Sequence, residues 1–271
     1  MENNVFIVAA VQLNSTDKVS DNLAKTEKLI YQAAKQGANL VALPENFAYL
    51  RSESEVIEYS QTLDGELVAW IKELAERLHI FLLAGSFPEK LNELGKIANT
   101  SLMVDPQGKI LAHYQKIHLF DATLADGTVL MESRYVEAGS ELVSAVIANH
   151  KMGLTICYDL RFPELYRKLT LAGAEAIFVP SAFTLQTGRD HWEPLLRARA
   201  IENQVYIIAP AQFGQHTPRR ASYGRAMIID PWGIVLAKAS DRECIIMAEL
   251  DFDYLQQIRT RMPCKQHVKL I

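Results

Sequence analysis

Residues 5–45 read VFIVAAVQLNSTDKVSDNLAKTEKLIYQAAKQGANLVALPE, and this stretch decides the fold class. Val5–Leu13 is an almost continuous apolar, β-rich run, which predicts a buried strand. A segment with apolar residues at helical spacing follows, and Gly37 is a typical stop for it. Residues 39–44 predict a second buried strand, so Glu45 falls at its carboxyl end. A β-α-β start of this kind favours strands that helices bury on both faces.

The same periodicities continue along the chain and predict further helices and strands. Helices are predicted over residues 65–78, 161–173 and 192–204. Strands are predicted over residues 80–87, 142–148, 154–157, 176–180 and 205–211. Hairpins are predicted over residues 100–116 and around residues 230–233. No low-complexity linker interrupts the pattern, so residues 1–271 are predicted to form one domain.

The two predicted hairpins resemble each other. Residues 103–112 read MVDPQGKILA, and residues 229–237 read IDPWGIVLA. Two β-rich halves that each carry helices suggest two sheets packed on one another with helices outside. The alternative is that DPxG is simply a common turn, and the sequence leaves the two interpretations open.

Composition restricts the partners and the compartment. The chain has 271 residues and a net charge of −4, which gives no electrostatic footprint for nucleic acid or a membrane surface. The basic cluster at residues 218–220 is short and is interpreted as a solvated loop. Three cysteines without CxxC spacing argue against a disulfide framework or a structural zinc site, and they favour a reducing, cytoplasmic compartment. No apolar stretch approaches the roughly 20 residues of a membrane span.

Cys157 is the candidate nucleophile. The chain lacks a GxSxG elbow, a phosphate loop, a dinucleotide fingerprint and an HExxH motif, and no pair of histidines has metal-ligand spacing, which leaves the cysteines. Cys157 ends a strand and opens a predicted helix, where backbone N–H groups and the helix dipole favour the thiolate and can hold an oxyanion. Considered alone, a buried structural cysteine is the stronger interpretation. Cys244 and Cys264 have no such setting and are interpreted as structural.

A nucleophilic thiol needs a base and an orienting charge. Glu45 lies at the mouth of a buried strand, where polar residues of α/β sheets often line a site. Lys116 ends the first hairpin just before an irregular segment. Either residue alone would be interpreted as a surface charge, and the case depends on both meeting Cys157. No histidine motif of the papain or caspase type accompanies the cysteine, which weakens a Cys-His protease interpretation.

Three blocks carry a family resemblance. Residues 43–45 (LPE), 114–121 (YQKIHLFD) and 153–164 (GLTICYDLRFPE) resemble, in order and spacing, the signature blocks of the carbon-nitrogen hydrolase (nitrilase-like) superfamily. The resemblance spans essentially the whole chain. It implies an α/β fold, a four-layer α-β-β-α sandwich of two mixed sheets, commonly paired into dimers or larger homo-oligomers. It also implies an enzyme that acts on a small-molecule amide without a metal or cofactor.

The resemblance also implies the role of each residue. Glu45 would be the general base and proton shuttle, and Cys157 would be the nucleophile. Lys116 would stabilise the tetrahedral oxyanion together with the backbone N–H of Tyr158. The family's second glutamate, which positions the substrate and the other catalytic groups, corresponds to Glu132.

Glu137 lies near Glu132 in the sequence but matches the family pattern less well. A catalytically silent binding protein is the alternative from a different functional class. The presence of all four matched residues counts against it, because a silent relative has no physical reason to keep them.

The residues after Cys157 indicate a branch of the superfamily. True nitrilases typically continue with Trp-Glu, whereas YDLRFPE resembles the branch of deaminated-glutathione amidases and omega-amidases. Residues 220–227 (RASYGRAM) and 230–233 (DPWG) are similar to the first of these. That activity splits an amide of 2-oxoglutarate to give 2-oxoglutarate and cysteinylglycine. Omega-amidase activity on alpha-ketoglutaramate is the second candidate.

An acidic substrate predicts a cation in the pocket. Arg161 follows Cys157 by four residues, one α-helical turn, and is a candidate for a bidentate carboxylate clamp. An ion pair of Arg161 with Glu164 or with another buried acid is an equally good interpretation. Phe183 and Thr184 follow the next predicted strand and are candidates for lining the same pocket.

Overall fold

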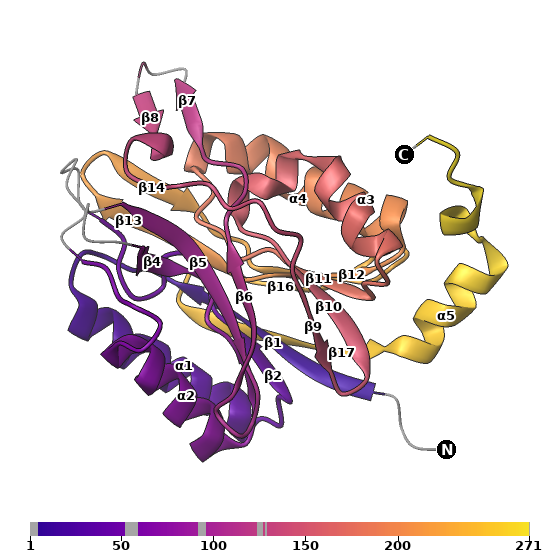
Figure 1. The fold of residues 1–271 in the computed structure, drawn as a ribbon, viewed down its shortest axis with the longest axis horizontal. Coiled ribbons are helices and arrows are strands. Elements are labelled where there is room, and N and C mark those ends of the chain that lie inside the picture. Colours follow the sequence, from indigo (N-terminus) through magenta and orange to yellow (C-terminus); the bar gives the residue numbers. More distant parts are fainter. Residues whose placement is uncertain (1–4, 52–58, 92–95, 124–126, 128, 271) are drawn as a thin grey trace.

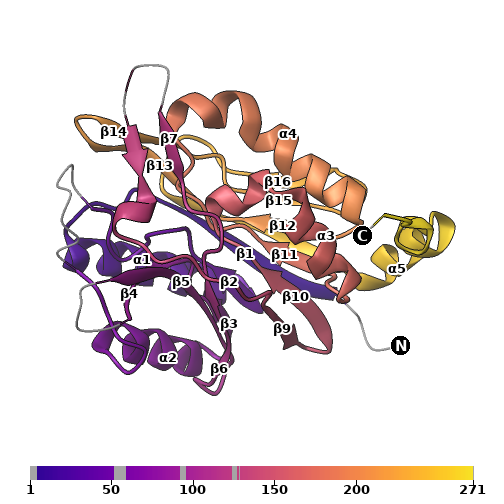
Figure 2. The same ribbon diagram turned by 45° about the horizontal axis from the view of Figure 1, so that its top comes forward.

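Two β-sheets pack on one another in the computed structural model, with helices on the outer surface of each (Figures 1 and 2). The structure describes residues 5–51, 59–91, 96–123, 127 and 129–270. The helices are α1 (Val19–Lys35), α2 (Glu66–Leu78), α3 (Pro163–Leu171), α4 (Leu185–Asn203) and α5 (Phe252–Arg261). Short 3₁₀ helices are η1 (Glu132–Arg134), η2 (Cys157–Arg161) and η3 (Cys264–His267).

The first sheet has the strand order β14-β13-β1-β2-β3-β5-β4, with β17 also paired to β1 and β6 to β5. Its strands are β1 (Val5–Leu13), β2 (Leu40–Ala42), β3 (Phe81–Leu83), β4 (Phe87–Lys90), β5 (Ile97–Val104), β6 (Ile110–Gln115), β13 (Ala211–Thr217), β14 (Arg220–Tyr223) and β17 (Cys244–Asp251). The second sheet has the order β16-β15-β12-β11-β10-β9. Its strands are β9 (Ser144–Ile147), β10 (His150–Leu154), β11 (Ala176–Phe178), β12 (Tyr206–Ala209), β15 (Met227–Ile229) and β16 (Val235–Lys238). A separate hairpin contains β7 (Asp121–Thr123) and β8 (Val129–Met131).

The layers follow the order α-β-β-α. Helices α1 and α2 cover the first sheet, and α3 and α4 cover the second, while α5 lies to one side near the carboxyl end (Figures 1 and 2). Both sheets contain parallel and antiparallel neighbours. The predicted sandwich of two mixed sheets is therefore confirmed. Among the described residues, no helix combines the length and the apolar character that a membrane crossing requires.

Strand β1 shows why a central strand of this fold is apolar at successive positions. Val8 and Ala10 belong to the core that fills the space between the sheets and continues to α3 and α4. Ala9 and Val11 belong to a separate core between the first sheet and the helices α1 and α2. Because side chains alternate along a strand, one β1 strand contributes to both cores. All four side chains are fully buried, as the sequence predicted.

The two halves of the chain repeat one arrangement. Parallel neighbours β1, β2 and β3 alternate with α1 and α2, and β10, β11 and β12 alternate in the same way with α3 and α4. Each set continues into an antiparallel hairpin, β5–β6 or β15–β16. The Oδ1 atoms of Asp105 and Asp230 each accept two backbone N–H bonds, and Gly108 and Gly233 each donate back to that aspartate's carbonyl. The structure thus favours a repeated unit over a chance turn motif.

Helix α4 begins at Leu185, seven residues before the predicted helix of residues 192–204. Gly188 hid its first turns, because glycine is a poor helix former. Gly188 has a packing reason, since a Cβ there would lie 2.3 Å from the Cβ of Tyr223. The longer helix joins β11 to β12, which are neighbours in the second sheet.

The sequence predicted a single strand over residues 205–211, and that prediction is wrong. β12 ends at Ala209 in the second sheet, and β13 begins at Ala211 in the first. Pro210 lies between them, and its missing N–H suits a break between two ladders. The crossing brings hairpin β13–β14 to the end of β1, next to the loop that follows β2.

Candidate active site

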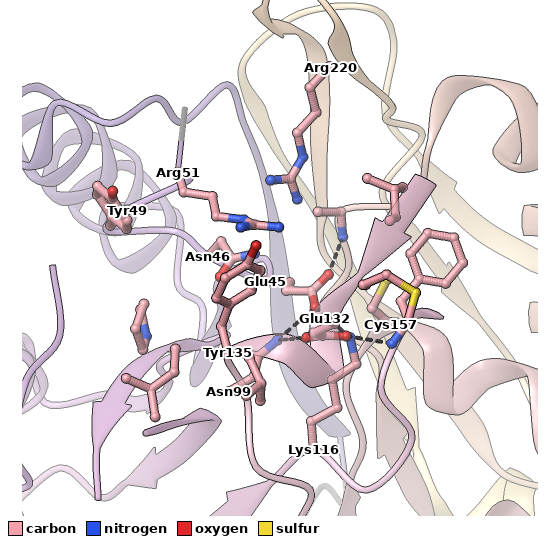
Figure 3. Close-up of a pocket in the computed structure, with 17 residues that line it drawn as sticks. Glu45, Asn46, Tyr49, Arg51, Asn99, Lys116, Glu132, Tyr135, Cys157 and Arg220 are labelled. Carbon is pink, nitrogen blue, oxygen red and sulfur yellow. Dashed lines mark hydrogen bonds and ion pairs between the residues drawn. The ribbon is translucent and has the colours of Figure 1, made fainter. Parts of the chain in front are cut away.

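Four sequence-predicted residues meet in one cavity (Figure 3). Glu45 follows β2, Lys116 follows β6, Glu132 begins η1 after β8, and Cys157 follows β10. The cavity opens to solvent and is lined by residues from both halves of the chain. The strand ends of both halves of the chain thus bring together groups that lie up to 112 positions apart, from residue 45 to residue 157.

Lys116 lies between two carboxylates. Its Nζ is 3.1 Å from Oε1 of Glu45 and 2.8 Å from Oε2 of Glu132. The amide of Asn99 donates to both glutamates, at 3.0 and 3.2 Å. The backbone N–H of Phe120 donates to Glu132 at 2.7 Å. The two carboxylates are therefore held on either side of a single ammonium group, which is itself 2% exposed.

Three segments fix the orientation of Glu45. The N–H of Ala182 donates to Oε2 at 2.8 Å, and the Gln212 side chain donates to the Glu45 carbonyl at 3.1 Å. Gly85 allows the close approach beneath this loop, because a Cβ there would lie 2.0 Å from the carbonyl oxygen of Pro44. The carboxylate is buried and keeps one direction relative to Lys116 and the cysteine.

Cys157 sits at a sharp turn between β10 and η2. Its φ of 46° lies in the left-handed region, which non-glycine residues rarely adopt. Its N–H donates to the carbonyl of Pro180 at 2.9 Å. Such backbone strain persists only where surrounding contacts impose it, and it concentrates at functional sites.

Asp159 provides that support. It is fully buried, and its Oδ2 accepts from the N–H of Ile156 at 2.8 Å and from the hydroxyl of Tyr114 at 2.7 Å. Its Oδ1 accepts from the N–H of His118 at 3.1 Å and lies 2.7 Å from the Nδ1 of that ring. Tyr114 and His118 stand two residues on either side of Lys116. Asp159 therefore links the cysteine turn to the lysine segment.

The charges of the site follow from these contacts. Burial and the charge of Glu45 raise the pKa of Cys157 well above its usual value, and Lys116 opposes this only in part. Burial also acts to raise the pKa of Glu45, but the nearby Lys116 and hydrogen bonds outweigh it, so this pKa is lowered. Burial acts to lower the pKa of Lys116, but Glu132 and Glu45 raise it well above its usual value.

The resting site therefore holds a thiol, two carboxylates and an ammonium group. The turn before η2 was expected to favour the thiolate of Cys157, but burial and the negative charge of Glu45 act more strongly and raise the pKa of the thiol.

Arg161 lies apart from the described residues that line the cavity. Its guanidinium stands over the rings of Phe183 and Tyr158, at 5.3 and 5.9 Å from their centroids, and 3.4 Å from Nδ1 of His191. The one-turn argument assumed an α-helix, whereas η2 is a 3₁₀ helix with three residues per turn. A side chain four residues after Cys157 then points about a third of a turn away from it. No ion pair with Glu164 occurs among the described residues either.

The remaining candidates lie outside the cavity lining in the described part of the chain. Phe183 packs against Trp192 with ring centroids 5.0 Å apart. Thr184 is the N-cap of α4. The ring of Tyr158 packs on Phe120, which does line the cavity. Glu137, the weaker match, is exposed and lies 3.7 Å from Lys96.

Sequence reasoning missed several polar residues of the cavity, notably Asn99, Arg51, Tyr135 and Arg220. Asn99 had a usable signal, because it is a polar residue in the fully buried strand β5. Arg220 was assigned to a solvated loop, and that interpretation is wrong. The described residues contain no cluster of three or more His, Cys, Asp or Glu side chains arranged to hold a metal ion.

Comparison with known proteins gives consistent matches. A family model described as carbon-nitrogen hydrolase matches residues 7–260. A deaminated glutathione amidase of Synechocystis sp. (strain PCC 6803 / GT-S) is 46% identical over 265 residues, which cover 97% of each chain. The crystal structure of the Caenorhabditis elegans NitFhit protein has a TM-score of 0.92 at 38% identity, and the match covers 99% of this chain and 66% of that one. Saccharomyces cerevisiae Nit3, a member of branch 10 of the nitrilase superfamily, has a TM-score of 0.84 at 33% identity over 96% of this chain and 94% of its own.

Proposed function

Since this chain belongs to the carbon-nitrogen hydrolase family, which hydrolyses the carbon–nitrogen bonds of amides, we propose that its substrate is deaminated glutathione. The single observation that carries the chemistry is the meeting of the Cys157 thiol, the Glu45 carboxylate and the Lys116 ammonium in one cavity. The substrate is supported by the 46% identity, over nearly the full length of both chains, to a protein named for that activity.

Acylation begins with a proton transfer from sulfur. Glu45 accepts the proton of the Cys157 thiol while Sγ attacks the amide carbon. The oxygen becomes an oxyanion beside Nζ of Lys116, with the backbone N–H of Tyr158 as a second donor. Glu45 then returns the proton to the amide nitrogen, the carbon–nitrogen bond breaks, and cysteinylglycine leaves. The 2-oxoglutaryl group stays on the sulfur as a thioester.

Deacylation uses the same groups in a second round. Glu45 takes a proton from water as the water oxygen attacks the thioester carbon. Lys116 again stabilises the oxyanion, the carbon–sulfur bond breaks, and the proton on Glu45 returns to the sulfur. 2-Oxoglutarate leaves, and the thiol and carboxylate of the resting state are restored.

Glu132 serves this cycle as a positioning residue. Its two oxygens are 2.8 and 3.1 Å from Nζ of Lys116, and it raises the pKa of that lysine. Lys116 therefore stays charged throughout, whether Glu45 carries a proton or not. Without the second carboxylate, each protonation of Glu45 would leave a buried ammonium without a counter-charge.

A substrate panel tests the assignment. Deaminated glutathione and alpha-ketoglutaramate both release 2-oxoglutarate, which gives one common readout for their kcat/KM values. Simple amides and nitriles complete the panel. We expect the highest kcat/KM with deaminated glutathione. Equal values on the two 2-oxoglutarate amides, or a preference for nitriles, would refute the proposed substrate.

We further propose that the protein works in the cytoplasm as a homodimer or larger homo-oligomer. All three cysteines are unpaired thiols, which suits a reducing compartment. Four large apolar side chains expose 42–54% of their surface. One is Ile201 of α4, and the others belong to the β15–β16 hairpin: Trp232, Ile234 and Leu236. Large exposed apolar side chains of this kind favour a subunit interface. Sedimentation equilibrium of the purified chain would refute this assembly if it gave the monomer mass of 30.5 kDa at micromolar concentration.

A further inference from the structure

Two arginines that have no role in the proposed mechanism line the cavity. Arg51 comes from the loop after β2, and Arg220 is the first residue of β14. In Figure 3 their guanidinium groups converge on the side of Glu45 that faces away from Lys116. Both line the same space as Cys157.

Neither guanidinium has a carboxylate partner within ion-pair distance among the described residues. Arg51 stands over the ring of Tyr135, 4.7 Å from its centroid. Burial and the charge of Arg51 lower the pKa of Arg220, while the charges of Glu45 and Glu132 oppose this less strongly. Two like charges held together in a partly buried cavity are unfavourable unless an anion occupies the space between them.

A carboxylate is the anion that fits this pair. A guanidinium presents a planar fork of N–H donors that matches the two oxygens of a carboxylate. The cavity is also negatively charged at its base, because Glu45 and Glu132 outnumber Lys116. A substrate with carboxylates therefore needs cations at the rim to offset repulsion from the base of the site.

The position of the arginines decides which part of the substrate they meet. The carbonyl oxygen must lie near Lys116, where the oxyanion forms. The leaving nitrogen must lie near Glu45, which returns the proton. Arg51 and Arg220 stand beyond Glu45 on the side away from Lys116, so they face the portion attached to the nitrogen (Figure 3).

We propose that Arg51 and Arg220 bind a carboxylate on the amine portion of the substrate, so that the enzyme selects amides whose amine portion is a peptide with a free terminal carboxylate over primary amides. This inference rests on the proposed function. In deaminated glutathione the group in question is the terminal carboxylate of cysteinylglycine. Alpha-ketoglutaramate has the same acyl portion and lacks this carboxylate, because its leaving group is ammonia.

Three substrates isolate the interaction. They are deaminated glutathione, its derivative with the terminal carboxylate converted to a carboxamide, and alpha-ketoglutaramate. All three give a 2-oxoglutaryl thioester and release 2-oxoglutarate. The variants are Arg51→Gln and Arg220→Gln, with Arg220→Lys to keep the charge, and Arg189→Gln as a control at an exposed arginine outside the cavity lining.

Each glutamine variant is expected to lower kcat/KM for deaminated glutathione by about 10- to 100-fold, the range for losing a hydrogen-bonded charge partner. The ratio of this value to that for alpha-ketoglutaramate should fall by nearly the same factor, and so should the ratio to the carboxamide. Arg220→Lys should recover part of the loss, and Arg189→Gln should keep all three values. Unchanged thermal unfolding midpoints exclude misfolding as the cause.

The outcomes separate the inference from the function on which it rests. Equal losses on all three substrates mean that the arginines serve the acyl portion or the site as a whole, and the inference is then wrong. Unchanged kcat/KM values overturn it as well. Wild-type protein that hydrolyses alpha-ketoglutaramate but leaves deaminated glutathione intact refutes the proposed substrate and the inference together.

Discussion

Replacing Glu45 with Gln keeps the size of the side chain and removes both its charge and its capacity to shuttle a proton. The exchange also changes the hydrogen bonds around residue 45. Oε2 accepts from the N–H of Ala182, and Oε1 accepts from Asn99 and Lys116. A glutamine has one oxygen and one NH₂ group, so the NH₂ faces a donor in either orientation.

The expected loss in the acylation rate has two parts. General acid–base catalysis contributes about 10²- to 10⁴-fold, and all of it is lost because Glu45 both accepts the thiol proton and delivers it to the amine. Loss of a hydrogen bond to a charged group adds about 10-fold or more, to the extent that Lys116 is misplaced in the transition state. We therefore expect acylation of Glu45→Gln by deaminated glutathione to be slower by about 10³- to 10⁵-fold.

The charge change also acts on the nucleophile in the opposite direction. The charge of Glu45 is one of the two main influences that raise the pKa of Cys157. Its removal should therefore let the thiol react with iodoacetamide at lower pH than in the wild-type protein. Faster alkylation combined with slower acylation distinguishes a lost base from a damaged site, because damage would slow both.

Mass spectrometry after acid quench measures the 2-oxoglutaryl thioester on Cys157 during a single turnover. An oxygen ester of 2-oxoglutarate with a good leaving alcohol serves as the control, since its departure does not require a proton from Glu45. The ester should acylate Glu45→Gln with a much smaller loss than the amide. A normal rate of thioester formation from the amide would refute the assignment of Glu45 as the base.

Three further predictions concern other residues of the fold. Cys157→Ala should abolish 2-oxoglutarate release while leaving the thermal unfolding midpoint within a few degrees of wild type, and a large fall in that midpoint would instead indicate a structural cysteine. Asp159→Asn places an NH₂ group against the donor from either Tyr114 or His118, so urea titration should show a loss of about 1–3 kcal/mol, with kcat reduced more than KM is changed. Burial, aided by the charge of Arg220, lowers the pKa of His216 to about 4 from 6.5. As pH falls, the unfolded chain therefore binds this proton before the folded chain does, so the free energy of unfolding should decrease between pH 6.5 and 4, by about 2 kcal/mol at pH 5. His216→Gln should flatten this part of a series of urea denaturations at different pH values. An unchanged slope would contradict the assignment.

Elements with strong local patterns could be predicted from the sequence. Val5–Leu13 is apolar at nearly every position because its two faces serve two cores, and that demand is visible residue by residue. The hairpins at Asp105 and Asp230 were recognisable because the side chain of one aspartate and the backbone of one glycine close each turn locally. In both cases the residues that cause the structure are neighbours in the sequence.

The arginine pair had no such signal. Arg51 and Arg220 are 169 positions apart, and they meet only because the chain changes sheets at Pro210 and returns along β1. Arg161 failed for the opposite reason: its spacing from Cys157 suggested proximity, but the turn is a 3₁₀ helix. A prediction from spacing depends on the type of helix, and composition alone does not distinguish the two types over five residues.

The neutral thiol of Cys157 has a consequence for the mechanism. A preformed thiolate would attack without giving up a proton, and Glu45, whose lowered pKa keeps it ionised, would then have none to deliver to the amine. An amide nitrogen leaves poorly unless it is protonated. Because the proton stays on sulfur until attack, activation of the nucleophile and protonation of the leaving group use the same proton and the same carboxylate. The opposite pKa shifts of Cys157 and Glu45 thus suit hydrolysis of amides, for which the leaving group rather than the nucleophile is the difficulty.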